Sequence, residues 1–196
     1  MINMFDMMRE AQEILSKNPL FLAISLSDEL KTHIIAIVDP KGEVLFESPP
    51  VLLFPPIIET HETVGTPTWA DIHDIVASII AKRHVCIYGA NLTVQDLNSV
   101  ASYYGKELPE FKPFCVARFY YRYFGGRGFY GEDDIDFIPE GTPEGERWRW
   151  ATIADAADYC FVDPPKDVHS YATYSAHLCA GIIHAMADPD ANIPDI

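Results

Sequence analysis

The chain has 196 residues, of which 48% are hydrophobic, and its formal net charge is −15 because 29 acidic side chains face 14 Lys and Arg. This composition is typical of a globular domain with its own core and excludes a disordered chain, and no apolar run reaches membrane-spanning length. So acidic a chain repels phosphate backbones unless metal ions or a local basic patch intervene, and no run of Lys or Arg indicates such a patch. The excess acid either only maintains solubility or forms a surface for a basic protein partner.

The first half of the chain predicts a helix followed by three strands. Residues 4–15 carry apolar side chains at helical spacing and lack the features of a signal peptide, so we expect a first helix and a cytoplasmic protein. Extended segments follow at 20–26, 33–40 and 43–54, and the DPKG sequence at 39–42 predicts a hairpin turn between the last two. A Pro- and Thr-rich loop comes next.

Helices dominate the middle of the chain. Residues 66–82 have a Thr near their start and apolar residues on one face, which predicts a helix. A buried strand is expected at 84–90 and a helix closed by a glycine at 93–105. Residues 114–126 indicate a short strand or turn that enters an aromatic helix.

The last third begins with a Gly-, Pro- and acid-rich insertion loop at 125–147, before two further helices at 150–162 and 169–187. We expect one domain over residues 1–188 and a tail at 189–196. A meander of strands followed by helices and another strand predicts a mixed α/β layout with a central sheet. Four scattered cysteines without a CxxC pair indicate buried thiols rather than disulfides or zinc ligands.

From about Met8 to Met186 the chain resembles the DEDD 3′–5′ exonucleases, the proofreading-exonuclease-like branch of the ribonuclease H fold. The segments that carry the resemblance, in unbroken order, are AQEILSKNPLFLAISLSDEL, HIIAIVDPKGEVLF, PPIIETHETVGTPTWADI, VCIYGANLTVQDL, WRWATIADAADYC and SYATYSAHLC. The resemblance implies a single α/β domain of ribonuclease H-like, exonuclease type, with a central mixed sheet and helices on both faces.

The catalytic chemistry of that family depends on four carboxylates, which hold two divalent ions such as Mg²⁺ or Mn²⁺, and on a general base. By the resemblance, hydroxyl residues occupy all five positions. Ser25 and Ser27 stand for the first Asp and Glu, Thr93 and Ser175 for the other two Asp, and Ser170 for the catalytic His. Neutral hydroxyls do not balance the charge of Mg²⁺. We therefore expect no catalytic residue, no metal and no cofactor, and a non-catalytic binding, regulatory or inhibitory module in nucleic-acid metabolism.

A relocated active site, which would need Mg²⁺ or Mn²⁺, is the first alternative. Asp28 follows the first motif, but a slip of one residue places it on the other face of the strand. Asp96 lies one helical turn beyond Thr93 and could point into the site, but an acidic residue at such a place is more commonly a solvated side chain on the helix surface. The third candidate, His169, directly precedes Ser170.

A non-cleaving single-strand or end-binding protein is the second alternative, because basic and aromatic residues interleave around residues 119–124. Core aromatics with solvent-facing arginines explain the same pattern. The candidate nucleic-acid-binding residues are Arg118, Arg122, Tyr123 and Arg127.

A protein partner is nevertheless favoured over nucleic acid, given the negative charge and the expected absence of metals to bridge phosphates. The acidic residues 131–146 are either a docking element for a basic partner or a flexible surface loop. His177 and His184, seven apart on the last predicted helix, are a weak metal pair and are interpreted as ordinary surface or partly buried histidines.

Overall fold

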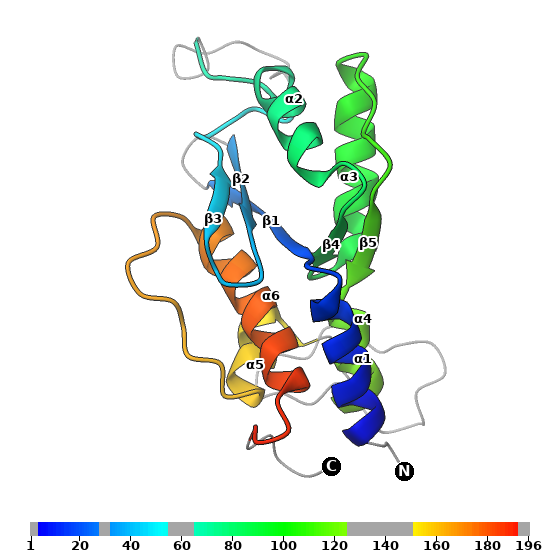
Figure 1. Cartoon of the computed structure of the whole chain (residues 1–196). Coiled ribbons are helices and arrows are strands. Elements are labelled where there is room, and N and C mark those ends of the chain that lie inside the picture. The colour runs from blue at the N-terminus through cyan, green and yellow to red at the C-terminus, as the bar shows by residue number, and fades with distance from the viewer. Residues whose placement is uncertain (1–3, 28–31, 55–64, 125–150, 192–196) are drawn as a thin grey trace, which may run out of the picture.

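A computed structural model describes residues 4–27, 32–54, 65–124 and 151–191. In this part of the chain a five-stranded mixed sheet lies between helices (Figure 1). The expected mixed α/β class is therefore confirmed. The predicted insertion loop at 125–147, Asp28 and Arg127 lie outside the described residues.

The first strand, β1 (Leu20–Ser27), is the centre of the sheet, whose order is β3-β2-β1-β4-β5. On one side it pairs antiparallel with β2 (Thr32–Val38), which pairs antiparallel with β3 (Val44–Glu47). On the other side it pairs parallel with β4 (His84–Ile87), which pairs parallel with β5 (Lys112–Cys115). The carboxyl ends of β1, β4 and β5 therefore lie at the same edge of the sheet.

Helices cover both faces of the sheet, as expected, because each helix buries an apolar stripe against one of two cores. One core is formed with α2 (Trp69–Ile80) and α3 (Ala90–Tyr103). The other is formed with α1 (Met4–Ser16), α4 (Val116–Phe124), α5 (Ile153–Tyr159) and α6 (Tyr171–Ala187). Figure 1 shows α6 lying along the sheet beside α5 and α1.

Strand alternation decides which side chains of β1 meet which helices. Leu20 and Leu22 enter the core with α2 and α3, whereas Phe21 enters the core with α6. Ser25 has the same parity as Phe21 and pairs with Ile34, which packs on the α6 core. The first hydroxyl of the β1 pair therefore faces α6.

Local sequence signals explain most element boundaries. In the β2–β3 turn the Asp39 carboxylate accepts from the backbone N–H groups of Lys41 and Glu43, and Gly42 has a φ of 84° that suits glycine. Thr68 and Asp71 form the capping box that begins α2. The helix expected from residue 93 begins at Ala90 instead, because Gly89, with a φ of 82°, turns the chain directly from β4 into it.

Candidate functional site

Two of the hydroxyls at positions that the resemblance aligns with catalytic groups lie where α6 packs against the sheet. Ser25, on β1, and Ser175, on α6, are each only 9% exposed. α6 packs across β1 and β2, so both side chains are enclosed in one layer. Among the described residues, no carboxylate hydrogen-bonds either hydroxyl. Small polar groups thus fill a packed interface here.

Two further positions lie at the carboxyl edge of the parallel strands. Ser27 is the last residue of β1 and pairs with Thr32. Thr93 is half-buried in the first turn of α3, which starts just after β4 ends. The fold therefore places these positions at the sheet edge where ligands of α/β proteins usually bind.

Ser170, which the resemblance aligns with the catalytic histidine of the family, is the N-cap of α6. Its hydroxyl accepts from the Thr173 N–H at 3.1 Å and donates to the Glu47 carboxylate at 2.8 Å. The Thr173 hydroxyl also donates to Glu47. Sequence reasoning missed Glu47, which lies on β3 in a segment identified only as a strand, and whose partners are more than a hundred residues away.

The donor set at these positions does not fit a pair of divalent cations. Within the described ranges, no three His, Cys, Asp or Glu side chains gather in a metal-binding group. Neutral hydroxyls replace the anionic ligands that hard cations require. One carboxylate oxygen of Glu47, Oε2, accepts from two hydroxyl donors instead.

The two relocated-site candidates that the structure describes, Asp96 and His169, do not converge. Asp96 is exposed on α3, and His169 is exposed just before α6 on the other face of the sheet. The neighbour of Asp96 is His33 of β2: burial lowers the pKa of His33, and the Asp96 charge partly opposes that shift. Within the described chain, His33 Nδ1 is buried without a hydrogen-bond partner.

The aromatic segment of α4 is part of the core, as the interpretation of residues 119–124 as core aromatics predicted. Tyr123 is buried, and its hydroxyl donates to Glu10 of α1 at 2.9 Å. Arg122 is exposed, but its Nη1 lies 2.8 Å from both carboxylate oxygens of Glu10. Two of the candidate nucleic-acid-binding residues thus hold α4 against α1.

Arg118 is the third candidate among the described residues, and its side chain is exposed. It borders a groove of about 450 Å³ between α3 and β5, whose other lining residues are Ala90, Val94, Gln95, Pro113 and Cys115. The groove is mostly apolar, with one cation at its rim. It therefore offers a single charged contact to a bound anion.

His177 and His184 hold the β2–β3 turn onto α6. His177 Nε2 lies 2.9 Å from the Gly42 carbonyl and Nδ1 lies 2.8 Å from the Thr173 carbonyl, while His184 Nε2 lies 2.6 Å from the Pro40 carbonyl. Both histidines therefore have structural partners. Helical spacing placed the two on one face, but no sequence signal indicated the turn that they contact.

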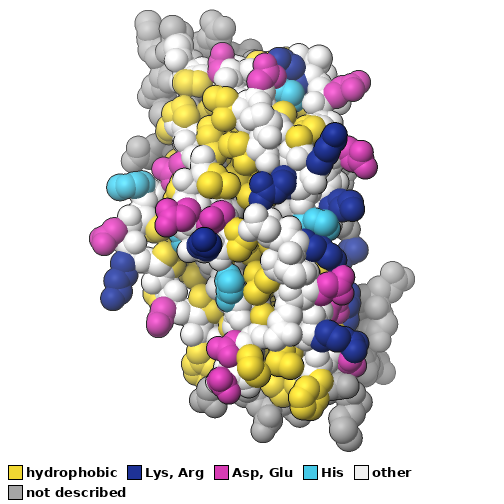
Figure 2. Space-filling model, in the orientation of Figure 1, with side chains coloured by type: hydrophobic (Ala, Val, Ile, Leu, Met, Phe, Trp, Pro, Cys, Tyr) yellow, Lys and Arg dark blue, Asp and Glu magenta, His cyan; other side chains and the backbone are white. Residues whose placement is uncertain are grey.

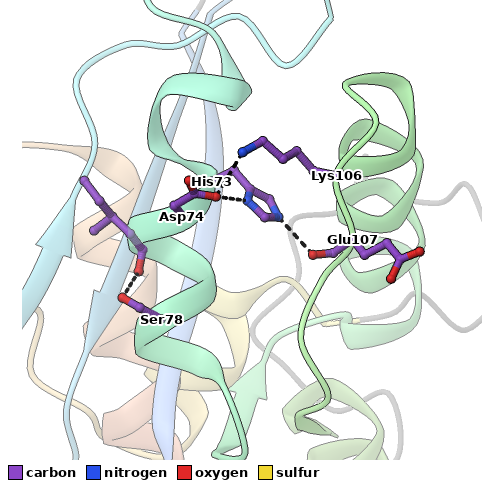
Figure 3. A network of polar contacts seen from close by, with 6 residues as sticks. His73, Asp74, Ser78, Lys106 and Glu107 are labelled. Carbon is purple, nitrogen blue, oxygen red and sulfur yellow. Dashed lines mark hydrogen bonds and ion pairs between the residues drawn. The ribbon is translucent and has the colours of Figure 1, made fainter.

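A second polar network joins α2 to the segment after α3 (Figure 3). His73 is buried, with Nδ1 2.8 Å from Asp74 Oδ1 and Nε2 3.1 Å from the Glu107 carbonyl. Lys106 Nζ donates to Asp74 at 3.1 Å. Hydrogen bonds from His73 and Lys106 lower the pKa of Asp74. These hydrogen bonds connect α2 to the segment after α3, so we interpret the network as structural.

A scan of family models found none that matches the chain, and a comparison with curated proteins found no match either. In the described part of the chain, no helix combines the length and apolar character needed to cross a membrane.

Proposed function

We propose that the chain is a non-catalytic homologue of the DEDD 3′–5′ exonucleases on a ribonuclease H-like fold. The described sheet is compatible with this assignment, because the resemblance implies a central mixed sheet with helices on both faces, and the described sheet is mixed and lies between two helical layers. The final helix α6 packs on β1, which brings the first and last predicted motifs to one interface.

One observation carries the proposal: hydroxyl residues stand at every position where the resemblance places a catalytic group. Ser25 and Ser175 are packed into the α6 interface, and Ser170 caps α6. Two-metal catalysis depends on anionic ligands, and without them the transition-state stabilisation from the metals is lost. The fold then serves as a surface rather than as a reaction site.

The surface acts, in this proposal, as a binding, regulatory or inhibitory module in nucleic-acid metabolism. A cytoplasmic protein partner suits the chain better than nucleic acid, since its net charge of −15 repels phosphates. Of the candidate nucleic-acid contacts that are described, Arg122 and Tyr123 already bond to Glu10.

The exposed Arg118, beside the groove between α3 and β5, supports a second candidate function, that of a non-cleaving single-strand-binding protein. Base stacking in such a protein needs exposed aromatic rings. The aromatic rings of α4 are mostly buried, so this candidate has the weaker support.

A nuclease assay tests the proposal directly. The purified chain is incubated with 3′-extended single- and double-stranded DNA and with RNA, in Mg²⁺ or Mn²⁺, beside an EDTA control. We expect no trimming, while circular dichroism shows a folded protein.

An Asp96→Ala variant serves as the control for a relocated site. Metal-dependent trimming that disappears in this variant would show that the site has moved and that the non-catalytic assignment is wrong. Salt-sensitive binding of a single strand without trimming, weakened by Arg118→Ala, would favour the second candidate instead.

A further inference from the structure

The fold assembles a basic patch that is not visible in the sequence. His84 and Lys112 are the first residues of β4 and β5 and pair directly across the two strands. Lys82 and Arg83 immediately precede β4, and the Arg83 carbonyl accepts from the Lys112 N–H at 2.9 Å. These side chains therefore lie at the amino-terminal edge of the parallel strands.

Lys17 joins this group from the end of α1. The Arg83 guanidinium donates to the carbonyl of Asn18, the residue after Lys17, at 3.0 Å. Lys17 and His84 line the same groove. The pKa of His84 is lowered first by burial and then by the positive charges of Lys112 and Lys17. Figure 2 shows Lys and Arg side chains gathering over this side of the molecule. We call Lys17, Lys82, Arg83, His84 and Lys112 the basic patch.

Most of the charge in the basic patch is not neutralised within the described residues. Lys17 pairs with Glu13 at 2.7 Å. Lys82, Arg83 and Lys112 have no carboxylate partner there, in contrast to Arg9, Lys106 and Arg122, which each pair with one. On a chain with a net charge of −15, three adjacent unpaired cations attract anionic groups to one place.

The basic patch is separate from the degenerate site. It lies at the amino-terminal ends of β4 and β5, whereas Ser27 is the carboxyl-terminal residue of β1 and Thr93 lies beyond the carboxyl end of β4. A ligand in the degenerate site therefore does not cover the patch. What binds at the patch is independent of whether the chain cleaves nucleic acid.

A groove adjoins the patch. It has a volume of about 450 Å³ and lies between α1 and the strands, and both Lys17 and His84 line it. Ile14, Cys86 and Phe114 supply apolar lining, and Asp6, Glu10 and Glu13 add three carboxylates. Each of these carboxylates is paired with a cation, namely Arg9, Arg122 and Lys17 in turn. An apolar side chain that enters the groove therefore meets apolar atoms beside carboxylates whose charge is already compensated.

We propose that the basic patch binds a short acidic segment of a partner protein that carries an apolar residue. A few carboxylates match the few cations of the patch, and the apolar residue enters the adjoining groove. A nucleic acid fits less well, because its continuous row of phosphates extends beyond the patch, and the chain as a whole carries a negative charge that repels phosphates. A short peptide presents its charge only where the patch lies.

Fluorescence anisotropy tests this proposal with a short labelled Glu-rich peptide that has one central Phe. The same peptide with Gln in place of Glu, and single-stranded oligothymidylate, are measured in parallel. We expect the Glu-rich peptide to bind most tightly and its affinity to fall with added salt. In a Lys82→Gln/Lys112→Gln variant the affinity falls about tenfold, because two of the contacting charges are gone.

The matched control is Lys41→Gln/Lys166→Gln, which removes the same charge from exposed sites outside the basic patch. Its affinity stays within about twofold of the wild type if the contact is local. An equal loss in both variants would reduce the effect to net charge and overturn the proposal. No binding of the Glu-rich peptide at low salt overturns it too, and so does tighter binding of oligothymidylate that the patch variant loses, which would make this a nucleic-acid surface.

Discussion

The Ser170 hydroxyl donates a hydrogen bond of 2.8 Å to the Glu47 carboxylate and so joins the start of α6 to the edge strand β3. The Thr173 hydroxyl donates to the same carboxylate, one turn along the helix. A negative charge at a helix N-terminus is favourable, because the helix dipole is positive there. Ser170 therefore has a structural role in this chain.

Replacing Glu47 is expected to destabilise the protein. Glu47→Ala leaves two partly buried hydroxyls without their charged acceptor. A hydrogen bond to a charged group contributes about 1.5–3 kcal/mol to the free energy of unfolding. We expect the free energy of unfolding, measured by urea denaturation, to fall by about 1–3 kcal/mol. Glu43→Ala, an exposed change just before the same strand, is the control and should cost less than about 0.5 kcal/mol. Equal effects of the two changes would contradict a specific role for Glu47.

Gly181 lets α6 approach the segment after α5. A Cβ on Gly181 would overlap Val162 Cγ1, and the β-branched Val162 has little freedom to move away. Gly181→Ala gains about 1 kcal/mol of helix propensity but loses about 1–3 kcal/mol to overpacking, so we expect a net loss of stability.

A double substitution separates these two effects. Val162→Ala removes the overlapping methyl group, so the Gly181→Ala/Val162→Ala protein should recover stability relative to the sum of the single changes. Additive losses, measured by thermal and urea unfolding, would show that the close approach is not the cause.

The β2–β3 turn is expected to depend more on His177 than on His184. His177 contacts carbonyls of both the turn and α6, whereas the exposed His184 contacts one carbonyl of the turn. His177→Ala should lower the free energy of unfolding by about 1–2 kcal/mol and His184→Ala by less than about 1 kcal/mol. Hydrogen exchange of the Gly42 region measures the same contact locally. A larger effect of His184→Ala would contradict this ranking.

Sequence periodicity predicted the elements well because helices and buried strands impose their own spacing on apolar residues. The capping box of α2 and the DPKG turn were readable for the same reason: their bonds join neighbours in the chain. The helix α3 began earlier than predicted, since the left-handed Gly89 was interpreted as part of the strand rather than as the start of the helix.

The contacts between distant segments could not be predicted in the same way. Glu47 meets Ser170, and Gly42 meets His177, only after the hairpin packs on α6. The basic patch arises because parallel pairing brings the starts of β4 and β5 together, although their lysines are thirty residues apart in the sequence. Spacing along the chain does not encode such pairs.

Acid is expected to destabilise the fold in part through His33. Burial lowers the pKa of His33 below 6.5, its ordinary value, so the unfolded chain binds the proton more readily. The stability contributed by neutral His33 is therefore present above about pH 6.5 and falls as the pH drops through the folded pKa. Because the Asp96 charge partly opposes the shift, Asp96→Asn should lower the pKa of His33 further. NMR titration of the imidazole measures it, and a pKa that rises in Asp96→Asn would contradict the described proximity.

The buried cysteines are expected to resist alkylation in the folded protein. Burial raises the pKa of Cys86 and of Cys160 to about 12, and it raises the pKa of Cys179 as well. At pH 8 a thiol with so high a pKa is thiolate about a thousandfold less often than an ordinary cysteine, and the thiolate is the reactive form. Cys115 is only half-buried and none of the four is in a disulfide.

Iodoacetamide treatment followed by mass spectrometry measures this difference residue by residue. We expect Cys115 to react first in native buffer and all four thiols to react at similar rates in denaturant. The packed α6 core that encloses Cys179 also encloses Ser175, so rapid alkylation of Cys179 in native buffer would mean that this interface opens. Slow alkylation would show instead that the layer that holds Ser25 and Ser175 is closed to solvent.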